Sequence, residues 1–468
     1  MSIQFSKPAA GRAIPVVLTC WVLGLAACAP LAPYQKPVMD VPSAFKEAPL
    51  WHAAQAPSDP VPDEWWRLFN DPALDQLQAD LVVGNENLKG SLAQYQAARA
   101  ALGLSQAARA PTLGATAGTT RGSSSVDNNN VSNAFSVGAV ASWELDLWGR
   151  LSGGVEVSQA KLQASQNDLA AARLSLQATL AQTYFSLRAA EMQVSLLDRT
   201  VVAYQRSLSL TQNRYGAGVA SRADVAQAQT QLKSTQAQLI EARSSRAQLE
   251  HALATLLGKP PASFSLPPTV MLPPAPLVPL QLPASLLERR PDIAAAERRV
   301  AAAYAQIGVA HAAYFPSLTL SGSAGYRGAV MADLINAPNL FWSLGPALAL
   351  SVFDGGARRA NEESAQATTA QAVAVYRQTV LTALQEVEDN LVLAASLQEE
   401  DGVQVEALAA ARKALEVVTN QYQAGTVSYL NVVTAQAAAL SVERSLLDVR
   451  NRRLLASAQL LKNLAGRW

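Results

Sequence analysis

Side chains that could carry out chemistry are sparse in this sequence, and the clearest of them is a single cysteine. Cys28 follows Leu25-Ala26-Ala27, at the end of a short apolar stretch that begins at Ile14 and has a positively charged flank. Such a stretch is too short to span a membrane and is typical of a secretory signal. Residues 1–27 are therefore predicted to be a signal peptide. The sequence before Cys28 resembles a bacterial lipobox, which predicts a lipid on this cysteine; the alternative is an ordinary signal peptide with an incidental cysteine.

The other reactive side chains form no recognisable reaction centre. Glu386, Glu388 and Asp389 lie together on a predicted helix, but acid–base catalysis also needs a pocket and a partner, so we interpret them as a solvated face. The second cysteine, Cys20, lies within the predicted signal peptide, and three scattered histidines provide no metal-ligand spacing. We expect no enzyme activity, no metal and no cofactor apart from the lipid on Cys28. The net charge of +1 indicates no nucleic-acid partner.

The elements that would position any site are duplicated. The segment 213–225 recurs at 420–432 with Asn, Tyr, Gly, Ser and Val at matching places. Each copy has a glycine that suits the left-handed residue at a helix end, followed by a serine with the spacing of a capping box. These sets are Gly218 with Ser221 and Asp224, and, as a weaker echo, Gly425 with Ser428 and Asn431. We therefore predict two helical hairpin tips.

Long helices flank both tips. The stretch 150–213 contains no proline, and as a helix it would be roughly 95 Å long. Apolar residues recur at every seventh position, which is typical of coiled-coil packing between helices. The two stripes are Leu180, Leu187, Val194, Val201, Leu208 and Tyr215, and Val387, Ala394, Asp401, Leu408, Leu415 and Tyr422, in which only Asp401 is not apolar.

Two strand-like segments precede each long helix. The stretches 135–146 and 342–352 alternate apolar with small or polar residues, the period of a strand with one apolar face. Pro346 predicts a bend or bulge in the last strand. Four aromatic residues near strand ends could form the girdle of a membrane barrel or pack in a core: Trp143, Trp148, Phe341 and Trp342.

Four strands are too few for a closed barrel in one chain. Small barrels need about eight strands, and an open sheet edge in lipid leaves backbone groups unpaired. A membrane barrel would therefore have to be assembled from several chains. The predicted organisation is a signal peptide (1–27), a lipid-anchored extended tether (28–62), a first repeat (63–257), a Pro-rich linker (258–283) and a second repeat (284–468). Each repeat contains a helix, two barrel strands and a long helical hairpin.

Motifs in both repeats resemble those of outer-membrane efflux lipoproteins, the OprM/NodT branch of the TolC-like outer membrane factors. They are Pro291-Asp292, Phe315-Pro316-Ser317-Leu318, residues 143–150 and 352–356, and both tips. The resemblance implies a mainly α-helical protein with a membrane β-barrel segment, which forms a homotrimer with a twelve-stranded barrel and a tunnel of twelve helices. It implies a place in the outer membrane of a Gram-negative bacterium. It also implies tripartite efflux of drugs or other small toxic compounds, with a periplasmic adaptor (membrane fusion protein) and an inner-membrane RND pump.

The resemblance also implies where the tunnel is closed and where the adaptor docks. The constriction falls on Tyr422, Leu430, Asn431 and Thr434, facing Asp224 on the other hairpin. Relatives often have Asp where this chain has Asn431 or Thr434, which argues against an acidic ring and plugging by divalent cations; size and dewetting could still narrow the pore. The tip residues for adaptor docking are Arg214, Tyr215, Gly218, Ser221, Gly425 and Ser428. Structural alternatives are the capping box for Asp224 and helix packing for Tyr215 and Tyr422.

Two other functions fit parts of this pattern. One is an outer-membrane channel of the same fold for type I protein secretion. The other is a lipid-anchored coiled-coil scaffold without a pore, which accounts for the seven-residue stripes but not for the four alternating strands.

Overall fold

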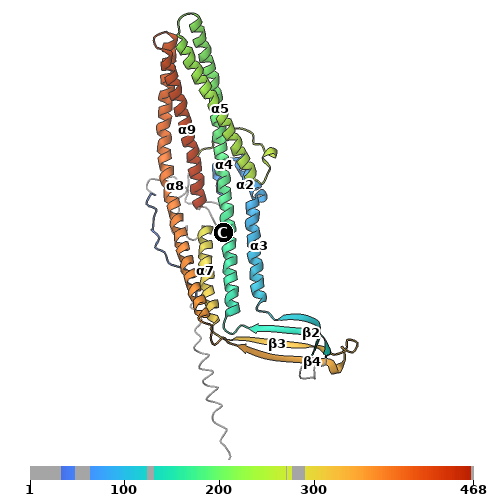
Figure 1. Cartoon of the computed structure of the whole chain (residues 1–468). Coiled ribbons are helices and arrows are strands. Elements are labelled where there is room, and N and C mark those ends of the chain that lie inside the picture. The colour runs from blue at the N-terminus through green and yellow to red at the C-terminus, as the bar shows by residue number, and fades with distance from the viewer. Residues whose placement is uncertain (1–32, 48–63, 124–130, 270, 277–289, 465–468) are drawn as a thin grey trace, which may run out of the picture.

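Two long helical hairpins stand side by side, and a four-stranded sheet lies at the end opposite their tips (Figure 1). The structure is a computed structural model that describes residues 33–47, 64–123, 131–269, 271–276 and 290–464. The predicted signal peptide and Cys28 lie outside the described residues. None of the described helices is long and apolar enough to cross a membrane.

The two repeats share the order of a helix, two strands and a long helical hairpin, and the first has additional short helices before its strands. The first contains η3 (Trp65–Phe69), α2 (Pro72–Gly84), α3 (Glu86–Ala107), β1 (Thr112–Ser123), β2 (Val131–Leu145), α4 (Arg150–Gly216) and α5 (Arg222–Leu256). The linker carries η5 (Pro261–Ser263). The second repeat contains α7 (Pro291–Ala312), β3 (Ser317–Gly328), η6 (Ala337–Asn339), β4 (Leu340–Ala349), α8 (Ala357–Gln423) and α9 (Tyr429–Leu464). The long helices α4 and α8 are both 67 residues, which confirms the predicted duplication.

The long helices begin in the same way in both repeats. Asp146 accepts hydrogen bonds from the backbone N–H of Ser152 at 2.7 Å and of Leu151 at 3.0 Å, and so caps the first turn of α4. Asp354 accepts from two backbone N–H groups at the start of α8, at 3.0 and 3.1 Å. A glycine with positive φ, Gly149 or Gly356, immediately precedes each helix. These turns change the chain direction, so that the strands run crosswise to the helices (Figure 1).

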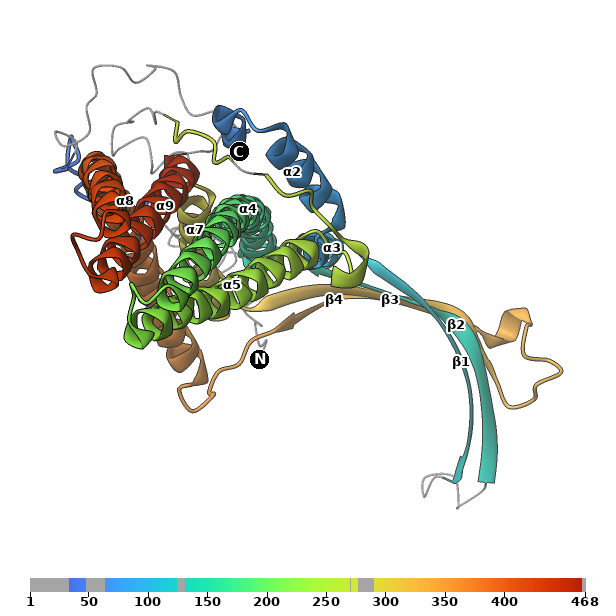
Figure 2. The same ribbon diagram turned by 90° about the horizontal axis from the view of Figure 1, so that it is seen from above.

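The sheet has the order β1-β2-β3-β4, and every neighbouring pair is antiparallel (Figure 2). The pairing of β3 with β4 advances residue by residue from Ser317 opposite Ala349 to Tyr326 opposite Leu340. The predicted bulge at Pro346 is therefore wrong. In the single chain β4 is an edge strand, the kind of strand to which proline, which lacks an N–H, is largely confined.

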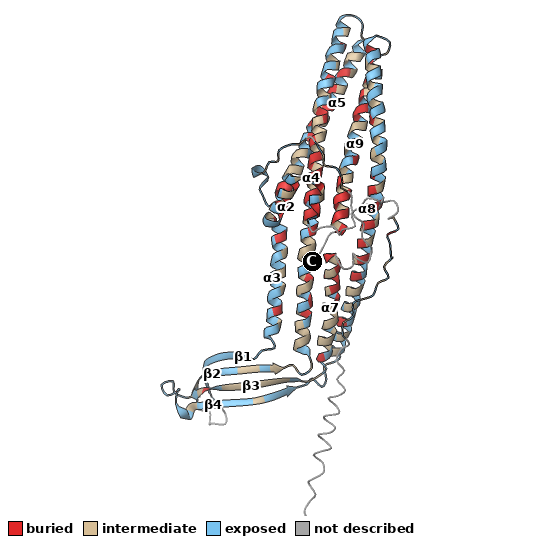
Figure 3. Cartoon of the chain, turned by 180° about the vertical axis from the view of Figure 1, so that it is seen from behind, coloured by how far each residue is buried: buried red, intermediate tan, exposed pale blue. Residues whose placement is uncertain are grey.

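Buried side chains concentrate in the middle of the helical body, whereas the sheet is largely exposed (Figure 3). The main cluster joins α2, α4, α5, α8 and α9 around Trp65, Phe69, Tyr184 and Phe185. The rings of Phe69 and Phe185 lie 4.6 Å apart. Burying such large aromatic side chains contributes strongly to the stability of a fold, so the helical body has a core within one chain and the sheet does not.

The Pro-rich linker is fixed to α4 and α5 by buried charges. Arg188 donates to the backbone carbonyl of Pro267 at 2.7 Å, and Glu191 accepts from the backbone N–H of Thr269 at 3.0 Å. Arg188 and Glu191 also form an ion pair at 2.8 Å with both side chains nearly fully buried. Because a buried ion pair is costly unless its partners are all present, this network holds the linker in place at Pro267 and Thr269.

The described part of the tether, 33–47, also packs on the helices. The Tyr34 hydroxyl donates to Glu297 of α7 at 2.7 Å. Glu388 of α8 accepts from the backbone N–H groups of Lys46 and Glu47 at 2.8 and 3.0 Å, and Glu386 forms an ion pair with Arg290 at 2.9 Å. The interpretation of these two glutamates as a solvated face was therefore wrong: they hold the tether and the start of α7.

Candidate functional site

The register of the sheet sorts its side chains into two faces. Partners across the ladders share a face, and neighbours along a strand alternate. One face, which we call the apolar face, contains Leu113, Ala115, Ala117, Phe135, Val137, Ala139, Ala141, Trp143, Leu145, Leu318, Leu320, Ala324, Tyr326, Leu340, Trp342, Leu344, Pro346 and Leu348, with Thr119, Arg121 and Asn133 toward the end farthest from the helices. The other, the polar face, contains Thr112, Thr116, Thr120, Ser136, Ser142, Glu144, Ser317, Thr319, Ser321, Ser323, Arg327, Phe341 and Ser343 together with glycines and small residues.

The apolar face is exposed in the single chain. Trp342 is 76% and Leu344 69% exposed. A continuous apolar surface over all four strands is unfavourable in water, whereas an apolar exterior with a polar interior is the pattern of a membrane barrel. Within the described residues, β1 and β4 each pair with one neighbour only, so the sheet has two free edges.

The four aromatic residues near the strand ends do not share one role. Trp143 and Trp342 lie on the apolar face near opposite ends of the sheet, as a girdle requires. Phe341 lies on the polar face, so the girdle prediction is wrong for this residue. Trp148 follows β2, stacks on Phe315 at 5.0 Å and donates to the carbonyl of Pro316 at 2.7 Å. Packing is therefore the role of Trp148 in the described chain.

The two hairpin tips are closed by glycines, as predicted. Gly218 has φ +76° and Gly425 has φ +80°, a conformation that costs other residues about 1–2 kcal/mol. At the first tip the Ser221 hydroxyl accepts from the N–H of Asp224 at 3.1 Å, and the Asp224 carboxylate accepts from the N–H of Ser221 at 2.9 Å. The predicted capping box is confirmed there. At the second tip, Asn431 and Ser428 are joined through a backbone hydrogen bond of 3.2 Å.

A set of side chains joins the two hairpins just below the tips, and we call it the hairpin latch: Ser207 and Arg214 of α4, Tyr422 and Gln423 of α8, and Tyr429 of α9. The Arg214 guanidinium lies 4.8 Å from the centre of the Tyr422 ring and donates to the carbonyl of Gln423 at 3.2 Å. Tyr422 and Tyr429 meet edge to face at 5.2 Å. The hydroxyls of Tyr429 and Ser207 are 3.0 Å apart. Burial raises the pKa of Tyr429, which keeps its phenol neutral.

The predicted constriction residues occupy different environments. Tyr422 is 6% exposed and belongs to the latch, which supports the packing alternative for this residue. Leu430 is 54% exposed, and Asn431 and Thr434 are also exposed on the first turns of α9. The Asp224 carboxylate is engaged in the capping box. Burial thus favours the packing alternative for Tyr422 but not for Tyr215, which is 49% exposed.

Tyr429 and Ser207 are latch residues that the sequence did not single out. Tyr429 occupies the place in the second repeat that Arg222 occupies in the first. Aligning the repeats for their shared residues hides positions at which they differ. A search for aromatic residues that occur in only one repeat could have found Tyr429.

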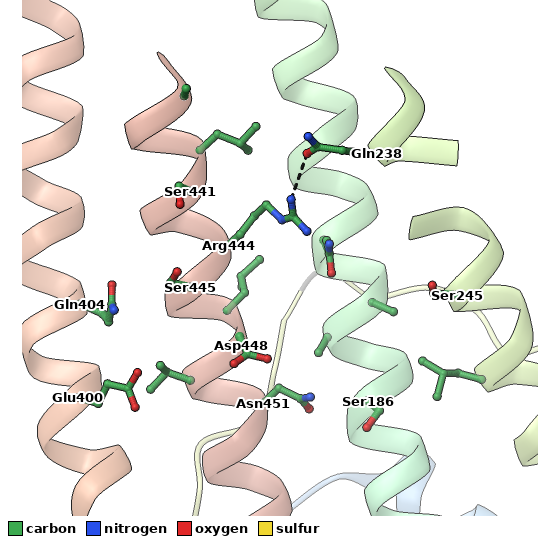
Figure 4. Close-up of a pocket in the computed structure, with 18 of the residues that line it drawn as sticks. Ser186, Gln238, Ser245, Glu400, Gln404, Ser441, Arg444, Ser445, Asp448 and Asn451 are labelled. Carbon is green, nitrogen blue, oxygen red and sulfur yellow. Dashed lines mark hydrogen bonds between the residues drawn. The ribbon is translucent and has the colours of Figure 1, made fainter. Parts of the chain in front are cut away.

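A polar groove lies between the two hairpins, along α4, α5, α8 and α9 (Figure 4). Its volume is about 820 Å³. Serine, glutamine and asparagine side chains from α4, α5, α8 and α9 line it, and Arg444 of α9 donates to Gln238 of α5 at 3.1 Å across it. Beside the groove, Leu197, Leu239 and Leu440 form an apolar contact between the same hairpins. In this region the hairpins therefore meet through an apolar contact beside a polar groove.

Comparisons with known proteins agree with this architecture. Residues 79–259 and 282–466 match the family described as outer membrane efflux protein. The outer membrane protein OprJ of Pseudomonas aeruginosa is 32% identical, over 99% of this chain and 97% of its own length. The cation efflux system protein CusC of Escherichia coli K12 is 30% identical, over 96% of this chain and 98% of its own. The probable outer membrane lipoprotein SilC of Salmonella typhimurium is 28% identical over 95% of this chain and 96% of its own.

Solved structures show the same fold. The outer-membrane channel OprN superposes with a TM-score of 0.86 at 29% identity, covering 93% of this chain and 98% of its own. CusC superposes with a TM-score of 0.84 at 29% identity, covering 94% of this chain and all of its own. The superposed part of the chain includes both repeats and the strands that each repeat contributes to the sheet.

Proposed function

This chain belongs to the outer membrane efflux protein family, and from that premise we propose that three copies join their sheets into one barrel and their hairpins into one periplasmic tunnel. The chain is an outer-membrane channel subunit of an efflux system and provides a passive exit for small molecules. The observation that supports this assembly best is the apolar face, which extends over all four strands while the opposite face is mainly polar. We assign it no enzyme activity.

The free edges of the sheet explain why several copies are needed. In lipid, an unpaired strand edge leaves backbone N–H and C=O groups without partners, at a cost of several kcal/mol for each group. Pairing β4 of one copy with β1 of the next satisfies both edges, and three copies supply more than the roughly eight strands that a small barrel needs. A coiled-coil scaffold without a pore offers no reason for the sheet or its two faces.

Cysteines introduced one at a time at two adjacent positions of β4 test the assignment of the polar face to the inside of the barrel. Ser343 lies on the polar face and Leu344 on the apolar face. Both natural cysteines, Cys20 and Cys28, belong to the N-terminal region; removal of the predicted signal peptide together with acylation of Cys28 would leave no other thiol. In intact cells, Ser343→Cys should react with a charged, membrane-impermeant thiol reagent, and Leu344→Cys should not. Equal reactivity at both positions would contradict a water-filled barrel.

The tunnel is closed at its periplasmic end by the tips in this proposal. Leu430, Asn431 and Thr434 are exposed at the start of α9 and are available to narrow the opening by size, together with the buried ring of Tyr422 behind them. Asp224 would contribute to this constriction with its side chain held in one place, because its carboxylate already accepts hydrogen bonds within its own turn. Opening requires the hairpin latch to release.

The partners in this proposal are a periplasmic adaptor and an inner-membrane RND pump. The adaptor would dock on the tips at Arg214, Tyr215, Gly218, Ser221, Gly425 and Ser428. Among these residues only Tyr215 is aromatic, and its ring is exposed. A lipid on Cys28 would anchor the chain to the outer membrane. Purification from membranes should recover the adaptor with the wild-type chain and less of it with Tyr215→Asp. Equal recovery would place the docking surface elsewhere.

A further inference from the structure

The polar face of the sheet carries one charge that is not neutralised. Among the described strand residues of this face, only Glu144 and Arg327 are charged. Arg150 donates to both carboxylate oxygens of Glu144, at 2.6 and 2.7 Å, which balances that charge. Arg327 forms no ion pair with any carboxylate of the described residues and is exposed. Its positive charge is therefore free to interact with charged molecules in front of this face.

Arg327 is held against the wall by an aromatic ring. Its guanidinium carbon lies 5.3 Å from the centre of the Phe341 ring on the neighbouring strand, a distance at which a cation is attracted to a ring face. Phe341 is paired with Gly325, and Gly325 is paired with Gly138 on the next strand. The ring thus stands beside two glycines, which have no side chains of their own.

The two glycines are required by a close approach of the strands. A Cβ atom at Gly325 would lie 2.3 Å from the carbonyl oxygen of Val137, and one at Gly138 would lie 2.7 Å from that of Ala324. No larger residue fits at either place without a shift of the backbone. Apart from Phe341 and Arg327, the central rows of the polar face are serine, threonine, valine, alanine and glycine. These two residues are therefore the bulkiest group on this surface away from its helical end.

Arg327 and Phe341 lie at the end of the sheet farthest from the helices. β2 ends at Leu145 and β4 at Ala349, where the chain enters the helical body, whereas Arg327 is next to the last residue of β3 and Phe341 is the second residue of β4. In the proposed barrel this end faces the outside of the cell. Three copies would place three arginines and three phenylalanines around the exit.

We propose that Arg327, held in place by Phe341, forms a cationic ring at the outer mouth that favours the passage of anions over cations. This inference rests on the proposed barrel. Rings of arginine are used by pores that select anions, and like-signed charge at the mouth of a narrow pathway changes passage rates by about tenfold or more. Because added salt screens exposed charges over about 8–10 Å, the preference must weaken at high ionic strength.

The test uses a cysteine behind the ring. Ser343 lies on the polar face, deeper in the proposed barrel than Phe341, and its hydroxyl is 2.8 Å from that of Ser323. Full-length Ser343→Cys protein in intact cells is exposed to a negatively charged and to a positively charged methanethiosulfonate reagent of similar size, and both reaction rates are measured. The ratio of the negative to the positive rate reports selection at the outer mouth, independently of the state of the periplasmic tips.

The expected ratio is above one in the wild-type background and falls about tenfold with Arg327→Glu, with Arg327→Gln between them. The matched control is Arg121→Gln, because Arg121 lies at the same end of the sheet on the opposite face; it should leave the ratio unchanged. Raising the salt concentration should shrink the difference between Arg and Glu at position 327.

A ratio that is the same with Arg, Gln and Glu at position 327 would overturn the cationic ring and leave the barrel intact. If the Ser343→Cys protein reacts with neither reagent while the Leu344→Cys protein reacts with both, the faces are assigned wrongly, and the barrel proposal fails together with this one. Trimers that resist detergent, measured for each variant, show that the Arg327 substitutions have assembled. Phe341→Ala gives a second test: with Arg327 no longer held by the ring, the ratio should fall about twofold.

Discussion

The tip between α4 and α5 and the tip between α8 and α9 come from one repeated sequence, but their stabilising contacts lie in different places. The first is held by its own capping box, in which Ser221 and Asp224 exchange hydrogen bonds, and its Tyr215 is 49% exposed. At the second, Tyr422 is 6% and Tyr429 2% exposed, and their contacts reach across to α4.

This difference indicates which hairpin is able to move. Contacts inside a single turn persist when neighbouring helices separate, whereas contacts between hairpins are lost. The first tip therefore keeps its structure whether or not the hairpins touch, and the second depends on the first. In the proposed gate, α4 and α5 are the fixed support, and α8 and α9 are the pair that is released when the latch opens.

The largest effect is expected when the matching tyrosines, Tyr215 and Tyr422, are replaced one at a time. Tyr422→Ala removes a buried ring, a change that costs about 3–5 kcal/mol in a well-packed site, so amide exchange in the first turns of α9 should accelerate by about a hundredfold to a thousandfold. Conductance through reconstituted channels should rise as the tips separate. Tyr215→Ala is the matched control and should change both quantities little. If the two variants behave alike, the second tip does not depend on the latch.

The sequence predicted the long helices, four strands and two tips because each has a local signal: a seven-residue stripe, an alternation, or a glycine followed by a capping serine. The strand register added what no single segment shows, namely that Phe341 shares a face with Arg327 and not with Trp342. The positions of Glu386 and Glu388 could not be predicted either, because their partners, Arg290 and the backbone of Lys46 and Glu47, are distant in the chain.

A smaller effect is expected from the capping box. Ser221→Ala removes the side-chain oxygen that accepts from the Asp224 N–H, and loss of such a cap costs about 1 kcal/mol. Exchange of the amides in the first turn of α5 should accelerate by about fivefold, with little change in α9. The matched change is Ser428→Ala, which should have a weaker effect on α9, because the second tip joins Ser428 and Asn431 through the backbone. Equal effects at both serines would remove the distinction between a locally closed tip and a supported one.

The smallest of these effects should come from the cation that joins the hairpins. Arg214→Gln introduces the residue found at the matching place in the second repeat, Gln421, and removes the contact with the Tyr422 ring. A cation–π contact of this kind contributes about 0.5–1 kcal/mol, so the open fraction of reconstituted channels should rise about two- to fivefold. Arg222→Gln, which removes an exposed charge from the same tip, is the control and should leave gating unchanged. Both variants lose one positive charge. If the open fraction rises in both, the charge of the tip controls opening. If it rises with Arg214→Gln alone, the contact between α4 and α8 controls opening.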